Sequence, residues 1–322
     1  MRVHTIDGHY GGVPEFAAAY LLVDGDEAAF VETCTASAVP RMLAALERSG
    51  LRPEAVRYVV VTHIHLDHAG GAGRLMQALP NATLLAHPRA APHAVDPARI
   101  VAGAVGVYGE QRFEELYDTI APVPASRVRA LEDAEEIPFG RGDLRFLHTR
   151  GHANHHFVVV APEADAVFTG DAFGIVYPAL QTQGLFAFPS TSPTDFDAVA
   201  AHTAVDVIAA CGAGRAFPTH FGEQRDISGI AAQLHAMLDG HAAILEQAEA
   251  DDLRGDSLGS FCARRVRALF DARVRALGLT GDPGLPLLEL DIDLNAQGIA
   301  FALQKRRYKR ERAAAAPAQK RK

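Results

Sequence analysis

The chain of 322 residues contains only three cysteines and no apolar run near the roughly 18 residues that a membrane-spanning helix needs. Cys34, Cys211 and Cys262 form no C-x-x-C pair, which argues against a disulfide framework and a cysteine-rich structural zinc site. Residues 1–7 do not have the pattern of a signal peptide. These absences predict a cytoplasmic protein with no membrane partner.

The most informative stretch is residues 62–68, which reads Thr-His-Ile-His-Leu-Asp-His. Imidazole and carboxylate groups bind zinc and similar divalent ions, so the stretch offers four potential ligands within six positions. The apolar residues 57–61 before it predict a buried strand, and the segment 69–73 after it predicts the start of a helix. The sequence therefore places His63, His65, Asp67 and His68 on a strand-to-helix loop, where side chains can converge.

Three later segments each carry one donor residue at the end of an apolar run, with a glycine close by. They are residues 149–152, 168–171 and 218–222, and they contribute His152, Asp171 and His220. Glycine lets the backbone turn sharply and approach a bound group closely. A catalytic zinc takes about three protein ligands plus water, so seven donors suit two ions that share a carboxylate.

The order of these motifs, HxHxDH, then GH, then TGD, then THFG, resembles the metallo-β-lactamase superfamily of hydrolases, most closely a group of stand-alone prokaryotic members with poorly defined substrates. The resemblance covers about residues 7–222. It implies an α/β fold, a four-layer αββα sandwich, with the metal site at one edge between two sheets. Carried over residue by residue, it assigns His63, His65 and His152 to one metal and Asp67, His68 and His220 to the other, with Asp171 bridging them.

Such a site suits hydrolysis of a small acyl substrate, which we expect to be a lactone, a thioester or an ester. Two divalent ions, zinc first with iron or manganese as alternatives, can hold a bridging hydroxide and polarise a carbonyl oxygen. Two residues are candidates for catalytic roles. Asp67 can also orient the water, and Tyr177 can donate a hydrogen bond to a developing oxyanion.

The chain departs from the family pattern at residues 31–34, where Val-Glu-Thr-Cys replaces the usual Val-Asp-Thr-Gly. Groups that surround the ligands orient them and tune the metal, so Glu32 and Cys34 put the local geometry in doubt. We expect Cys34 to be a small buried residue. His155 and His156 follow His152 closely and are candidates for supporting the ligands, although polar residues at a strand start would look the same.

The pattern divides the chain into a catalytic core at residues 1–225, a helical region at 226–304 and a basic, disordered tail at 305–322. The core contains a helical insertion at about residues 88–125, whose apolar face with Tyr108, Phe113 and Tyr117 favours a pocket or a dimer surface. We expect two loops, residues 9–16 and residues 177–193, to border the site, and Leu185, Phe186 and Phe188 of the second loop either line a pocket or enter the core. The tail has nine Lys or Arg residues in a chain of net charge −8 and is most simply a solubilising segment.

Several alternatives stay open at this point. A phosphodiesterase or nuclease of the same fold is possible, but the acidic body makes nucleic acid an improbable partner, and we expect a small molecule instead. A mononuclear iron sulfur dioxygenase shares much of this ligand set. Di-iron reductases of the superfamily typically have a glutamate where this chain has His65. A β-lactamase, a non-catalytic binding protein and an oligomeric assembly are further possibilities.

Overall fold

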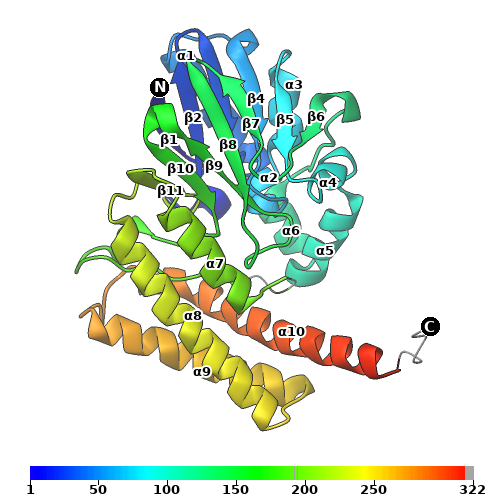
Figure 1. Cartoon of the computed structure of the whole chain (residues 1–322), viewed down its shortest axis with the longest axis vertical. Helices are drawn as coiled ribbons and strands as arrows, with labels where there is room; N and C mark the ends of the chain where they lie inside the picture. The colour runs from blue at the N-terminus through cyan, green and yellow to red at the C-terminus, as the bar shows by residue number, and fades with distance from the viewer. Residues whose placement is uncertain (192, 194, 316–322) are drawn as a thin grey trace, which may run out of the picture.

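The computed structural model describes residues 1–191, 193 and 195–315. Two β-sheets pack face to face, and helices cover their outer faces (Figure 1). The first sheet has the order β1-β2-β3-β4-β5-β6 and the second has the order β11-β10-β9-β8-β7. The first comprises β1 (Arg2–Asp7), β2 (Ala18–Asp24), β3 (Glu27–Val31), β4 (Val56–Val60), β5 (Thr83–Ala86) and β6 (Val128–Ala130). The second comprises β7 (Glu136–Phe139), β8 (Gly142–His148), β9 (Phe157–Ala161), β10 (Ala166–Gly170) and β11 (Arg215–Pro218).

Both faces of the central strands are apolar because each sheet is covered on two sides. Successive strand residues point to opposite faces, so Tyr20 and Leu22 of β2 enter the core between the sheets, whereas Leu21 and Val23 face the outer layer. In the second sheet, Phe157 of β9 belongs to the same inner core. The strands are hydrophobic along their whole length because both of their faces are buried. The four-layer αββα sandwich expected from the resemblance is confirmed.

The outer layers contain α1 (Val39–Arg48) and α3 (Ala72–Ala78) against the first sheet and α7 (Ala198–Ala209) on the other side, where α8 (Ile227–Ala250) packs against α7. Met42 and Leu46 lie one turn apart on α1 and are both buried, as the predicted amphipathic pattern requires. The side chains of Asp197 and Asp226 cap α7 and α8 by accepting hydrogen bonds from backbone N–H groups.

The strand order brings the ligand-bearing loops together. Strands β3, β4, β5 and β6 run parallel to one another, and β10 is parallel to β11. The carboxyl ends of parallel strands meet at one edge of a sheet, so the loops after β4, β10 and β11 open at the same place. The short helix α2 (Leu66–Ala69) follows β4 there and carries Asp67 and His68.

The predicted insertion is helical and consists of α4 (Ala91–Val95), α5 (Ala98–Tyr108) and α6 (Glu110–Tyr117). In Figure 1 these helices lie beside the sheets, at the end where α10 passes. The aromatic residues named above split in their roles. Tyr108 and Tyr117 line a cavity, whereas Phe113 is a buried core residue.

Three long helices, α8, α9 (Gly255–Ala276) and α10 (Leu288–Ala315), pack on one another at one end of the sandwich (Figure 1). Residues 305–315 belong to α10, so the expectation of disorder from residue 305 is wrong for this part. Helix-favouring Ala, Lys and Arg residues allow the helix to continue, and Arg306 and Arg310 pair with Glu249 of α8. Residues 316–322 of the tail lie outside the described residues. None of the described helices has the length and apolar character needed to cross a bilayer.

Candidate metal centre

All seven side chains predicted as metal ligands converge at one edge between the two sheets. His63 Nε2 lies 2.8 Å from His65 Nδ1, and His152 Nε2 lies 3.0 Å from the same atom. A zinc ion binds histidine nitrogens at about 2.0–2.1 Å, which requires such a cluster of neighbouring nitrogens. These three histidines therefore form one group whose ligand atoms are close enough to hold a metal ion.

The second group consists of Asp67, His68 and His220. Asp67 Oδ2 lies 3.4 Å from His220 Nε2 and 3.6 Å from His68 Nε2. Three donors face one point here too, and the side chain of Asp67 is 24% exposed, whereas those of both histidines are buried. Asp67 is thus the member of this group that a molecule entering from solvent can reach.

Asp171 lies between the two groups and presents one oxygen to each. Its Oδ2 is 3.5 Å from His152 Nε2 of the first group. Its Oδ1 is 3.2 Å from His68 Nε2 and 3.6 Å from His220 Nε2 of the second. This is the arrangement that a carboxylate shared by two cations requires.

Four of the ligand histidines, His63, His68, His152 and His220, make a hydrogen bond through Nδ1, the ring nitrogen that faces away from the cluster. His152 Nδ1 donates to the Ser190 carbonyl at 3.0 Å, and His220 Nδ1 donates to the Phe16 carbonyl at 2.7 Å. A carbonyl oxygen can only accept, so in both rings Nδ1 carries the proton and Nε2 is left with a lone pair. Such bonds are the usual means by which a protein orients metal-binding histidines.

Glu32 performs the same task for the second group. Its Oε1 lies 3.1 Å from His68 Nδ1, and it also accepts hydrogen bonds from the hydroxyls of Thr62 and Thr219. Because the Thr62 proton goes to Glu32, the Thr62 oxygen accepts from His63 Nδ1 at 3.1 Å. The longer side chain of Glu32 therefore connects the loops after β3, β4 and β11 and orients ligands in both groups.

His156 contacts the backbone of Asp171 and accepts a hydrogen bond there, whereas the pair His155 and His156 was expected to donate to the ligands. The backbone N–H of Asp171 donates to His156 Nε2 at 3.3 Å, and His156 Nδ1 is 2.8 Å from the Thr149 hydroxyl. Gly170 precedes Asp171 with a φ of 49°, and a Cβ atom there would meet Thr62 and His156. A glycine at this position thus lets the bridging residue approach the cluster closely.

The electrostatics of the cluster suit a cation. Burial lowers the pKa of His63 and of His65 well below the ordinary value, which keeps both rings neutral and able to coordinate. Burial also opposes a charge on His68, but the carboxylates of Asp171, Asp67 and Glu32 outweigh it and raise the pKa of His68. His68 Nε2 and Asp171 Oδ1 are buried without a hydrogen-bond partner among the described residues. Buried polar atoms normally have one, so a divalent cation fits these residues.

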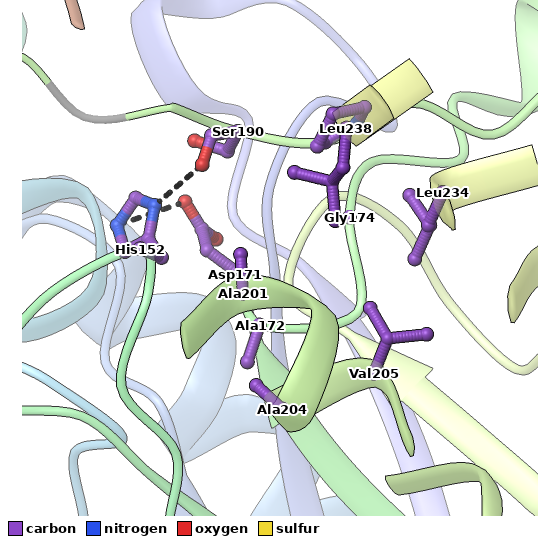
Figure 2. Close-up of a pocket in the computed structure, with 11 residues that line it drawn as sticks. His152, Asp171, Ala172, Gly174, Ser190, Ala201, Ala204, Val205, Leu234 and Leu238 are labelled. Atoms are coloured by element: carbon purple, nitrogen blue, oxygen red, sulfur yellow. Dashed lines mark hydrogen bonds and ion pairs between the residues drawn. The ribbon is translucent and has the colours of Figure 1, made fainter. Parts of the chain in front are cut away.

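A cavity of about 460 Å³ opens above the cluster. His65, Asp67, His152 and Asp171 lie at its base, and its walls come from the insertion helices, the 190–193 loop and Leu294 of α10. A second, smaller cavity of about 20 Å³ lies beside His152 and Asp171. Figure 2 shows His152 next to Ser190 and Asp171, with apolar side chains of α7 and α8 around them.

Other predicted residues lie elsewhere. Tyr177 is 1% exposed and does not line the large cavity; its ring packs against Phe16 and His220. Its proposed bond to an oxyanion therefore stays a prediction, and its position beside His220 is a packing role. Phe186 and Phe188 are core residues, as one of the two alternatives for them predicted, and Cys34 is buried, as expected.

Sequence reasoning missed Asp291 of α10, which is buried beside Tyr177. Burial raises the pKa of Asp291 to about 7. Asp291 stands in no motif of its own, so the only signal was an acidic residue on a helix. Tyr10, in the loop after β1, bonds to the hydroxyl of Tyr117 behind the cavity wall.

Two apposed sheets with seven convergent donors at their shared edge define a metal-binding αββα protein. The family model of the metallo-beta-lactamase superfamily matches residues 12–220, so the chain belongs to this superfamily, whose members are typically metal-dependent hydrolases. Two solved structures have the same fold as this chain and confirm the fold that the resemblance implied. A metallo-beta-lactamase superfamily protein from Sulfolobus tokodaii, ST1585, has a TM-score of 0.62 at 19% identity and covers 92% of this chain and 97% of its own. The metallo-beta-lactamase family protein TTHA1429 from Thermus thermophilus has a TM-score of 0.62 at 20% identity, covering 95% of this chain and 94% of its own.

Among curated relatives, the N-acyl homoserine lactonase AttM of Azorhizobium caulinodans is 29% identical over 177 residues, which are 51% of this chain and 56% of that protein. The metallo-beta-lactamase fold-containing protein ST1585 of Sulfurisphaera tokodaii is 28% identical over 147 residues, which are 42% of this chain and 49% of that protein. The chain thus matches about half the length of these relatives.

Proposed function

We propose that the protein is a hydrolase that uses two divalent metal ions, zinc in the first place, to cleave a small acyl substrate such as a lactone, thioester or ester. The observation that carries this proposal is the position of Asp171, which offers one carboxylate oxygen to each of two three-residue ligand groups. His63, His65 and His152 would hold one ion, and Asp67, His68 and His220 the other. Bound there, the ions would supply an activated water and polarise the scissile carbonyl.

The residues of the chain account for binding and for proton handling. Asp67 is the exposed carboxylate at the cavity base and accepts a hydrogen bond from the attacking water, which holds that water on the side of the substrate. Burial raises the pKa of the Asp67 carboxyl, but His68 and His220 outweigh it and lower this pKa, so the group is an acceptor at neutral pH. Apolar side chains of α7 and α8 pack beside His152 and Asp171 on the other side of the site.

The cavity supports an uncharged, partly apolar substrate. Ile64, Leu66, Ile100, Ala104, Val107 and Leu294 form an apolar wall, while Arg99, His93 and His155 are the basic side chains among the described lining residues outside the ligand set. A nucleic-acid site combines many cations along a groove, which this cavity does not provide. The name of one relative, N-acyl homoserine lactonase, supports a lactone as the first substrate to test.

The test is metal content by elemental analysis on protein purified without chelator, followed by a screen of lactone, thioester, β-lactam and phosphodiester substrates. We expect about two zinc or manganese ions per chain and hydrolysis of an acyl substrate. Asp171→Ala should lose bound metal and nearly all activity while keeping the fold, whereas His235→Ala, a half-exposed histidine on α8, should change neither. One iron per chain with no hydrolysis, or phosphodiester cleavage alone, would refute the proposal.

A further inference from the structure

Three tyrosines from separate parts of the chain meet on one wall of the large cavity. Tyr117 ends α6 and Tyr108 ends α5, and both line the cavity together with His65 and Asp67. Tyr10 approaches from the loop after β1, and its ring centroid lies 5.9 Å from that of Tyr117, the same separation as between Tyr108 and Tyr117. The insertion and the N-terminal loop thus build a wall of hydroxyl groups that faces the candidate metal centre.

The hydroxyl groups have a proton to spare. The oxygens of Tyr10 and Tyr117 are 2.8 Å apart in a buried hydrogen bond, and the Tyr117 hydroxyl is also within hydrogen-bonding reach of Tyr108. Two bonds among three hydroxyls use two of their three protons. With Tyr10 and Tyr108 both donating to Tyr117, and no carbonyl or carboxylate of the described residues accepting from these hydroxyls, the Tyr117 proton remains available for a molecule in the cavity.

The protonation of the tyrosines and the apolar wall beside them determine the kind of acceptor. Burial, and after it the negative charge of Asp67, raises the pKa of each of the three tyrosines. The hydroxyls therefore stay protonated at neutral pH and can donate. Ile64, Ile100 and Val107 line the same cavity and disfavour a charged group, so a neutral oxygen is the acceptor that fits.

Packing alone does not require these hydroxyls. Phe113 lies on α6 next to Tyr117, with ring centroids 5.3 Å apart, and fills its part of the core without a polar group. Tyr117 is only 3% exposed yet borders the cavity, a position where an unneeded hydroxyl would carry a desolvation cost.

We infer that Tyr117, held by Tyr10 and flanked by Tyr108, donates a hydrogen bond to a neutral carbonyl or ring oxygen of the substrate and so positions it over the metal centre. The inference rests on the proposed function and narrows it. The substrate carries an uncharged oxygen acceptor on the α6 side and an apolar group against α5. The insertion helices, rather than the residues that bind metal, then set the specificity.

The test compares Tyr117→Phe with the wild type in two assays on zinc-loaded protein. The first is calorimetric binding of a hydrolysis-resistant analogue, an N-hexanoyl aminolactam. The second is the kinetics of the corresponding N-hexanoyl lactone. Removal of one hydroxyl should weaken lactam binding about five- to tenfold and raise KM for the lactone by a similar factor, with metal content unchanged. Tyr10→Phe should have a smaller effect in the same direction, because it removes the support rather than the donor.

Tyr58→Phe is the matched control. Tyr58 is a half-buried tyrosine of β4 that packs against Phe139 and does not line the cavity, so this variant should bind and turn over as the wild type does. Lactam binding and KM within twofold of the wild type in Tyr117→Phe would overturn the inference, as would a wild type that does not bind the lactam. Lactone hydrolysis by the wild type decides the proposed function separately. If the lactam binds in a way that depends on Tyr117 but no lactone is hydrolysed, the inference about Tyr117 is supported and the proposed hydrolase function is refuted.

Discussion

His241 is a buried histidine that should make the stability of this protein depend on pH, independently of the metal centre. It lies within α8, is fully buried, and packs against Phe270 of α9 with ring centroids 6.5 Å apart. Neither ring nitrogen has a hydrogen-bond partner among the described residues. Burial lowers the pKa of His241 from 6.5 to about 4. The unfolded chain therefore binds this proton more tightly than the folded protein does.

The sign follows from linkage. Stability rises with pH wherever the unfolded state binds more protons, so the folded protein is fully stable above pH 6.5 and loses stability as the pH falls toward 4. For a shift from 6.5 to about 4, the loss relative to pH 8 is about 2 kcal/mol at pH 5 and about 3 kcal/mol at pH 4. This is a large fraction of the stability of a typical domain.

His241→Leu removes the titrating group while keeping a side chain of similar size. Leucine needs no hydrogen bond, so the variant should be at least as stable as the wild type at pH 8 and more stable by about 2 kcal/mol further at pH 5. Urea unfolding at pH 8, 6.5 and 5 measures the difference in the free energy of unfolding between the variant and the wild type. Both proteins are kept in the same metal state, and because they share the other histidines, the contributions of those histidines cancel in the difference. His235→Leu, at a half-exposed position on the same helix, is the control. A difference between His241→Leu and wild type that stays constant from pH 8 to pH 5 would refute the reasoning.

Two further predictions concern the residues around the metal ligands. Glu32→Gln removes the charge that orients His68 and should weaken metal binding by about 10- to 100-fold in a chelator competition. Glu27→Gln, at the start of β3, is the control and should leave the metal affinity unchanged. Equal metal affinities of the two variants would contradict the role given to Glu32. Gly170→Ala places a side chain at a φ of 49° against Thr62 and His156 and should destabilise the protein by about 3 kcal/mol in urea unfolding. Gly106→Ala, with open space in α5, should stabilise it by about 0.5–1 kcal/mol, and similar values for the two variants would show that the close approach at Gly170 is unimportant.

The sequence by itself determined the parts of the protein that are encoded locally. Apolar runs marked the strands, 3.6-residue periodicity marked the insertion and the C-terminal helices, and the spacing within residues 62–68 marked the ligands. Predictions from these features were correct because the features depend on residues that lie close together in the chain. The basic segment 305–315 shows the limit, since its composition suggested disorder whereas pairing with Glu249 and continuation of α10 hold it in a helix.

Only the tertiary structure decided which distant residues share a surface. Tyr10 and Tyr117 are 107 positions apart and carry no pattern that links them, yet their hydroxyls meet on the cavity wall. Glu32 looked like a weak substitute for aspartate, but the spacing of three loops makes its extra length fit His68 and Thr219. Tyr177, which was expected to donate to an oxyanion, packs against Phe16 and His220. Such contacts depend on how sheets and helices pack in three dimensions, which no local pattern records.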